Sequence, residues 1–484
     1  MALYENIKGS QKVSRYVVPF SFIGNYIEVV DKINEDWELM QPPKTEQDVY
    51  EYIASSLYLS EAELKNKTSS IGSLWSKREG GRISFPSLGY KDSADSENIY
   101  PISFERMGMS LFRNGLGFIW YDVILMNSEK EPVKNTNIII NFHDTFKELN
   151  QDRNTSMIIQ LSDEQSEGFI MGEWIKQILL ENFGCVRFYP GRLHCMSNTM
   201  KKTKSDKVVQ DIVPDKARLF NCYYIYHEGD IQLQKKLTMQ LSSGYNNRYK
   251  VSTFNNSQLF RPFENVYWNI CKEGCGCCVS IEENDEFFEK WFPNKVLNDY
   301  FMLYLLLLYQ SYSLFIYAER IETDFSADSQ YYLNSKEYSG IQTFLAEMNT
   351  FMLKSTHVSV SHIQHQDDFY NYGMKELRIY EDIKSVMSGA GTLGEMQKLV
   401  ENHEKEECDS KLNTALALLA IWTLFSAITD GLASVDWIFS DNNSRGNPLY
   451  WFFSILIIVS IFTIGAVALS RIITRKNKRR SKKG

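Results

Sequence analysis

The chain has 484 residues, with 52 Lys and Arg against 60 Asp and Glu, and a net charge of −8. Its last fourteen residues, RIITRKNKRRSKKG, hold eight basic side chains and no acid, so the rest of the chain carries −16. This acidic balance argues against nucleic acid as a direct partner of the main body. We expect no secretory signal peptide, because no cationic segment followed by an apolar run opens the chain. The eight cysteines are then intracellular, where thiols or metal ligands are expected rather than a disulfide framework.

Residues 1–290 show the pattern of a cytosolic α/β domain. Runs of apolar, β-branched or aromatic residues between polar clusters predict strands at Tyr16–Val30, Gly117–Met126, Asn137–Phe142, Met157–Leu161 and Arg218–His227. A helical pattern covers Glu164–Asn182, and the polar segments Ser69–Arg82 and Thr199–Asp211 are predicted to be loops. About 410 residues precede the membrane segments, which is too many for one core, so we expect two sub-domains.

Residues 291–411 are predicted to form a helical stalk region. The run Val296–Ile321 contains FMLYLLLLYQSYSLFIY and approaches the composition of a membrane span. Its four tyrosines and Gln310, and the acids Asp299 and Glu319 at its ends, favour a helix buried among other helices. Further helical patterns cover Ser335–Leu353 and roughly Gln364–Met387.

Three glycines, Gly389, Gly391 and Gly394, interrupt the last helical pattern. Each glycine costs about 1 kcal/mol relative to alanine inside a helix. One interpretation is a turn between two helices. The other is a gating hinge within one continuous stalk that leads into the membrane.

Two apolar segments lie near the end of the chain, at Ala415–Phe439 and Tyr450–Leu469. Each reaches the roughly 20 residues that a helix needs to cross a bilayer. The link SDNNSRGNP is too short to fold alone, so the segments are predicted to form a transmembrane hairpin. The basic tail stays on the cytoplasmic side. Both termini are therefore expected in the cytoplasm, beneath the inner (cytoplasmic) membrane. The predicted divisions are helix 412–439, external loop 440–448, helix 449–470 and tail 471–484.

This arrangement resembles the CorA superfamily of divalent-cation channels, in which a cytosolic α/β domain precedes a stalk, two spans and a basic tail. The resemblance covers roughly Asn294–Gly484. It implies a homopentamer with a divalent cation in the pore. The family signature Gly-Met-Asn is missing, and the external mouth offers Asp441, Asn442 and Asn443 instead. The chain is more similar to a divergent branch that accompanies type III CRISPR systems. That similarity implies gating by a nucleotide second messenger such as adenylylated S-adenosylmethionine, in antiphage defence.

A polar stripe follows one face of the first span. Thr423, Ser426, Asp430 and Ser434 are spaced by three, four and four residues. A carboxylate within the membrane should face water or a partner. The stripe therefore predicts a pore lining with a ring of Asp430, and the alternative is that Asp430 only lies at the outer interface.

Two further groups are candidates for binding. Cys271, Cys275, Cys277 and Cys278 lie within the run CKEGCGCC, where four thiolates would suit zinc if the crowded spacing let them converge. Arg153, Arg192 and His194 are candidates for holding an anionic ligand, with a plain surface loop as the alternative.

The sequence shows no catalytic motif, and we expect no enzyme. The two apolar spans, the polar stripe and the resemblance together predict an oligomeric channel in the lipid bilayer. The resemblance implies that a small nucleotide opens it and that the ion leakage arrests growth. Two alternatives remain: a constitutive magnesium or divalent-cation transporter, and a membrane-tethered ligand-binding protein without a pore.

Overall fold

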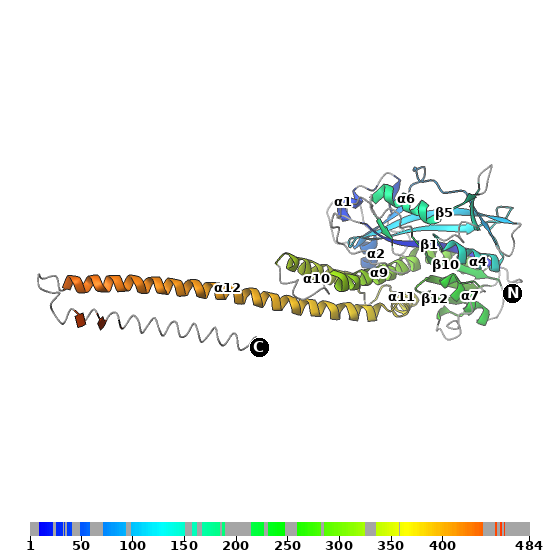
Figure 1. Ribbon diagram of the computed structural model, residues 1–484. Coiled ribbons are helices and arrows are strands. Elements are labelled where there is room, and N and C mark those ends of the chain that lie inside the picture. The colour runs from blue at the N-terminus through cyan, green and yellow to red at the C-terminus, as the bar shows by residue number, and fades with distance from the viewer. Residues whose placement is uncertain are drawn as a thin grey trace. The chain divides into compact units, whose positions relative to one another are not determined.

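The computed structural model describes residues 9–22, 26–31, 33, 36–40, 49–58, 71–92, 98–150, 157–161, 167–183, 186–188, 214–226, 231–246, 259–281, 285–324, 335–357, 359–438, 451–452, 455–456 and 459. The chain divides into two compact units, Met1–Leu393 and Gly394–Gly484. The first unit contains one large sheet with helices on both of its faces (Figure 1).

The sheet has 13 strands and is antiparallel at every described pairing except β10 with β13. Its order is β11-β12-β13-β10-β1-β6-β5-β4-β7-β8, with β9 beside β1, β3 beside β5 and β2 beside β3. The strands are β1 (Gly9–Phe22), β2 (Trp37–Leu39), β3 (Gly72–Lys77), β4 (Leu88–Lys91), β5 (Ile99–Phe112), β6 (Leu116–Leu125), β7 (Ile158–Gln160), β8 (Glu167–Gly168), β9 (Val186–Phe188), β10 (Arg218–Ile225), β11 (Phe260–Phe263), β12 (Val266–Cys271) and β13 (Gly274–Ser280).

Strand β1 crosses the middle of the sheet and divides two hydrophobic cores. Because successive side chains of a strand point to opposite faces, Val13 and Val17 enter one core and Tyr16, Val18 and Phe20 enter the other. The first core is covered by α2 (Glu51–Leu57), α9 (Phe301–Asp324), α10 (Ser335–Ser355), α11 (Gln364–Glu376) and the start of α12 (Ile379–Ile438). The second core is covered by α1 (Tyr26–Val30), α4 (Thr136–Phe146), α6 (Met171–Phe183) and α7 (Ile231–Ser243).

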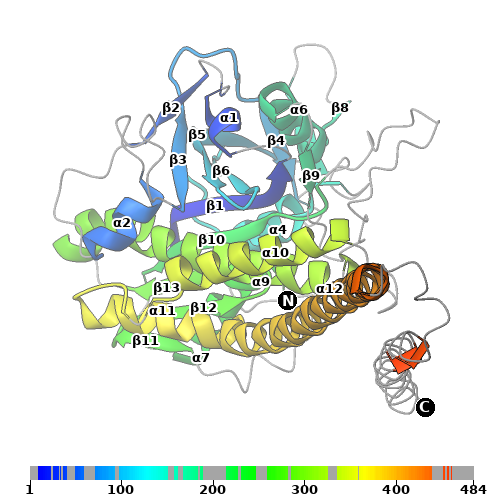
Figure 2. The same ribbon diagram turned by 90° about the vertical axis from the view of Figure 1, so that its left-hand side faces the viewer.

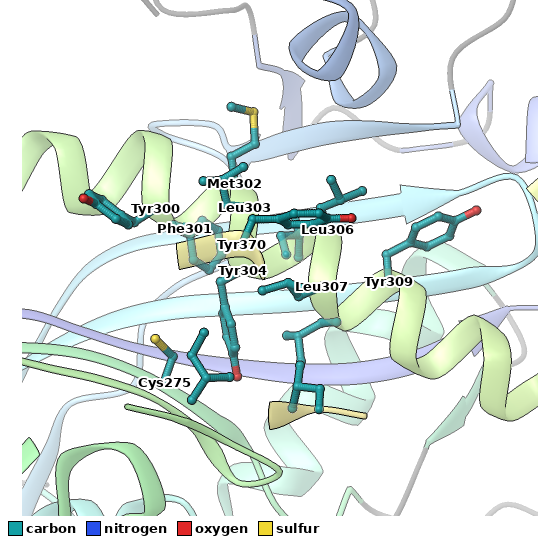
Figure 3. Close-up of a cluster of buried hydrophobic side chains, with 14 of the residues drawn as sticks. Cys275, Tyr300, Phe301, Met302, Leu303, Tyr304, Leu306, Leu307, Tyr309 and Tyr370 are labelled. Carbon is teal, nitrogen blue, oxygen red and sulfur yellow. The ribbon is translucent and has the colours of Figure 1, made fainter. Parts of the chain in front are cut away.

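Helix α9 is the centre of the first core, and Figure 2 shows it grouped with α10 and α11. Within the described part of the chain, one helix is long and apolar enough to cross a membrane, and it spans Phe287–Glu322. Because 72% of its apolar window is buried inside the protein, this helix is a core element, as the sequence predicted. Leu303, Tyr304, Leu306 and Leu307 all point into the packed interior shown in Figure 3.

Several predicted elements are confirmed. Strands β6, β7 and β10 occupy three of the predicted strand segments, and α10 matches the helix predicted from Ser335. The helix predicted at Glu164–Asn182 is present as α6, which begins later, after the short strand β8. The mixed sheet domain followed by helices is therefore present. The helices predicted to form a separate region after residue 290 instead pack on the sheet, so they share its core.

Other predictions were wrong for identifiable reasons. Asn137–Phe142 belongs to helix α4, because Asn135 accepts from the backbone N–H groups of residues 137 and 138 and caps the helix. The strand predicted through Val30 ends at Phe22, and α1 follows. Strand β3 lies within the predicted loop Ser69–Arg82, where Leu74 and Trp75 are buried on opposite faces. The predicted loop Thr199–Asp211 lies outside the described residues.

The glycines near residue 390 do not form a turn. Helix α12 continues through Gly389, Gly391 and Gly394, so the turn interpretation was wrong. The helical pattern breaks earlier, at Arg378, whose backbone has φ of 59° and ends α11 before α12 begins. The hinge interpretation stays a prediction.

Close packing of α7 on β13 explains the glycines of the run CKEGCGCC. A Cβ on Gly276 would lie 2.5 Å from the Ser242 nitrogen and 2.7 Å from the Thr238 carbonyl oxygen. We expect Gly276→Ala to lower the free energy of unfolding by about 1–3 kcal/mol, measured by urea titration. Gly340→Ala is the matched control, because a Cβ there meets nothing within 4 Å. Equal stability of the two variants would contradict the packing argument.

Burial of His143 makes stability depend on pH. Desolvation, followed by the charge of Lys147, lowers the pKa of His143 to about 3, whereas the unfolded chain titrates near 6.5. The unfolded state therefore binds the proton first, and stability falls as the pH drops from 6.5 toward 3. Between pH 7 and 5 we expect the wild type to lose about 2 kcal/mol more than His143→Asn, measured by urea titration at both pH values. Parallel losses would show that His143 is not the group responsible.

Candidate ligand cavity

The first unit contains a cavity of about 460 Å³ between the sheet and the start of α9. Strands β1, β2, β3, β5 and β6 form its floor and one side, and the helical segment before α9 forms the opposite wall. Its lining residues are Arg15, Glu38, Met40, Tyr58, Leu74, Ser76, Lys77, Arg78, Glu79, Phe85, Glu105, Arg106, Met107, Trp120, Leu297, Asn298, Phe301, Met302 and Leu305. A space of this size suits a small organic molecule.

Arg15 is a buried cation at the floor of the cavity, with only 3% of its surface exposed. Its Nε and Nη2 atoms donate to the two carboxylate oxygens of Asp122, at 2.6 and 2.7 Å. The guanidinium also lies 4.0 Å from the ring centres of both Trp120 and Phe301. This bidentate pair with two aromatic contacts holds the side chain in one orientation.

Trp120 forms a buried aromatic part of the cavity floor. It is 5% exposed, and among the described residues its indole Nε1–H has no hydrogen-bond partner. Gly108 pairs with it across β5 and β6, and a Cβ on Gly108 would lie 2.0 Å from the indole ring. The glycine therefore makes the room in which the indole lies against the sheet.

The rim carries charges of both signs. Its cations are Lys77, Arg78 and Arg106, and its acids are Glu38, Glu79 and Glu105. A β-bulge lies between Phe104 and Arg106 in β5, and bulges re-aim side chains beside binding sites. With three groups of each sign, the rim is electrically balanced and can meet a ligand that carries both charges.

The helical wall contains a π-helical turn, η3 (Val296–Tyr300), immediately before α9. Leu297 and Asn298 of this turn line the cavity, and the Leu297 carbonyl lies 3.5 Å from Arg15 Nη1, which donates to it. Turns of this kind are frequent at functional sites, because the extra residue widens the helix and frees a carbonyl.

The predicted cysteine site does not assemble. Cys275 and Cys277 lie in the core beneath α9, whereas Cys278 lies in the core on the opposite face of the sheet. Burial raises the pKa of Cys271 to about 11 and the pKa values of Cys275, Cys277 and Cys278 further, which disfavours the thiolates that bind zinc. In the part of the chain that is described, no three His, Cys, Asp or Glu side chains gather as metal ligands.

The predicted pore residues lie on α12. Thr423, Ser426 and Asp430 are exposed in the single chain, and Ser434 belongs to the same helix but its side chain is outside the description. The remaining candidates lie outside the described residues: Arg153, Arg192, His194, Asp441, Asn442 and Asn443.

Sequence reasoning missed the cavity residues. One signal was present, because Arg15 stands between Val13 and Val17 at positions that share one face of a buried strand. A charge at such a position requires a buried partner. Its partner, Asp122, lies 107 residues away and no spacing rule connects the two.

We expect Asp122→Ala to lower the free energy of unfolding by about 3–5 kcal/mol, because it leaves a buried arginine unpaired. The combined Arg15→Met and Asp122→Leu replacement should recover most of that loss, since it removes both charges. Urea unfolding followed by tryptophan fluorescence measures both. A double variant as unstable as Asp122→Ala would show that the cost lies in the lost packing and not in the unpaired charge.

Comparisons with protein-family models, curated proteins and solved structures gave no match to this chain. The assignment of a function therefore rests on the residues and geometry of the chain itself.

Proposed function

We propose that the chain is a CorA-like, cation-conducting membrane oligomer that a small cytosolic ligand opens. The observation that carries the proposal is the exposure of the apolar side chains in both predicted spans. On α12, Leu416, Leu418, Leu419 and Trp422 are all exposed, and Trp422 is 78% exposed. Such side chains at neighbouring positions cover more than one face of the helix, which is the pattern of a helix surrounded by lipid.

The second predicted span supports the same conclusion. Trp451, Phe452, Ile455, Leu456 and Val459 are exposed wherever this segment is described. Helix α9 has a similar apolar composition but is buried, so apolar character alone does not distinguish the two kinds of helix. In our proposal the two exposed segments form the membrane hairpin, and the basic tail keeps both termini in the cytoplasm of the inner membrane.

The polar stripe supports conduction rather than simple anchoring. A lipid anchor needs no carboxylate, whereas Asp430 lies near the middle of the predicted span Ala415–Phe439, and Asp436 lies nearer its end. Several copies around a common axis would place Thr423, Ser426 and Asp430 at a water-filled path. The number five comes from the CorA resemblance alone, as does the role of the cytosolic unit as sensor for a nucleotide messenger in type III CRISPR defence, such as adenylylated S-adenosylmethionine.

Helix α12 supports a mechanical link between sensor and membrane. It is one helix of 60 residues that begins against α9 at Ile379 and continues to Ile438 in the first span. A ligand that binds the open state more tightly would shift the population toward it. We propose no catalytic activity. The rival functions are a constitutive magnesium transporter and a tethered binding protein without a pore.

The decisive variant is Asp430→Asn. We expect it to lower cation flux through liposomes roughly tenfold, because a ring of carboxylates concentrates cations at the path, while the oligomer stays intact by native mass spectrometry. Asp409→Asn is the matched control, since it removes an exposed acid from the same helix outside the span. Unchanged flux and selectivity in Asp430→Asn would remove this residue from the path, and absence of flux in the wild type would favour the tethered binder.

A further inference from the structure

We infer that the cavity lined by Arg15, Trp120 and the η3 turn is the binding site for the gating ligand. We further infer that this ligand carries charges of both signs on a compact, partly apolar body. That this ligand opens a channel rests on the proposed function. That the cavity binds a ligand does not.

The rim selects the charge of the ligand. Lys77, Arg78 and Arg106 attract anionic groups, but Glu38, Glu79 and Glu105 share the same rim. A polyanion would gain from the first set and be repelled by the second. A ligand with one cationic and one anionic group satisfies both sets, so the balance favours mixed charge over a polyphosphate.

The floor selects the body of the ligand. Met40, Met107 and Met302 line it together with Phe301, and methionine side chains adapt to the shape of a bound molecule. The indole Nε1 of Trp120 is itself buried, so the ring forms part of the apolar floor and offers no hydrogen bond to the ligand. The charge of Arg15 is already paired with Asp122 at the floor of the cavity. The cations available to bind the ligand are therefore those of the rim.

The helical wall gives this cavity a route to the stalk within the first unit. The next two residues of η3, Asp299 and Tyr300, contact α11. The Gln366 Nε2 of α11 donates to Asp299 Oδ2 at 3.4 Å. The Tyr300 hydroxyl lies 2.9 Å from the Nδ1 of His365, also on α11. Helix α11 ends at Glu376 and α12 begins at Ile379. A molecule that moves the η3 turn therefore acts on the helix that leads directly into the stalk.

The test is calorimetric binding to the full-length protein in detergent with three probes that share an adenosine body. S-adenosylmethionine carries both charge signs, ATP is a polyanion and adenosine is neutral. We expect S-adenosylmethionine to bind more tightly than the other two. Arg106→Ala should weaken its binding roughly ten- to a hundredfold, by loss of a charged hydrogen bond. Lys290→Ala, outside the cavity, should have no effect.

Three results would overturn the inference: ATP binding as tightly as S-adenosylmethionine, equal binding by Arg106→Ala and the wild type, or no binding of any probe at millimolar concentration. Flux through liposomes separates this inference from the proposed function. Cavity-dependent binding without flux would leave the site standing and reject the channel. Flux that responds to ligand equally in the wild type and in Arg106→Ala would keep the channel and reject the site.

Discussion

The structure of the first unit depends on the burial of α9 against the face of the sheet that carries Arg15. This face is mostly apolar, although Arg218 of β10 also meets α9 there by donating to the Tyr312 hydroxyl. A lone guanidinium at Arg15 would be destabilising by several kcal/mol. Asp122 neutralises the charge. Trp120 of β6 and Phe301 of α9 pack their rings against the guanidinium. One side chain of β1 thus joins the neighbouring strand to the central helix. The same contact fixes the floor of the cavity.

From Gly274 to Cys277 the glycines and cysteines of β13 alternate, and each kind of residue packs on a different face of the strand. Gly274 and Gly276 let α7 approach the backbone of the strand, and the alternating Cys275 and Cys277 fill the core beneath α9. The cysteines are small apolar residues in this setting, since burial raises their pKa values and keeps the thiols protonated. Their crowding in the sequence reflects strand alternation, and strand alternation is what keeps Cys278 apart from them.

Two kinds of apolar helix occur in this chain, and composition does not separate them. Helix α9 is surrounded by the sheet and by α10 and α11, and inside the protein its Tyr312 hydroxyl accepts from Arg218 and its Gln310 donates to Tyr370. Most of the described side chains at the apolar end of α12 are exposed. Packing, rather than composition, therefore distinguishes α9 from the described part of α12.

The sequence by itself determined the elements whose patterns are local. Runs of apolar, β-branched or aromatic residues between polar clusters predicted β6, β7 and β10, and the polar residues within the apolar run at residues 296–321 identified α9 as a buried helix. The polar stripe on α12 also follows from helical spacing alone. The Asn135 cap of α4 and the left-handed backbone at Arg378 are also local features, but they were not recognised from the sequence. Tertiary structure decided the rest. Pairing with β5 drew Leu74 and Trp75 into a strand. The cavity depends on partners such as Arg15 and Asp122 that are far apart in the chain, and only the folded sheet brings their charges together.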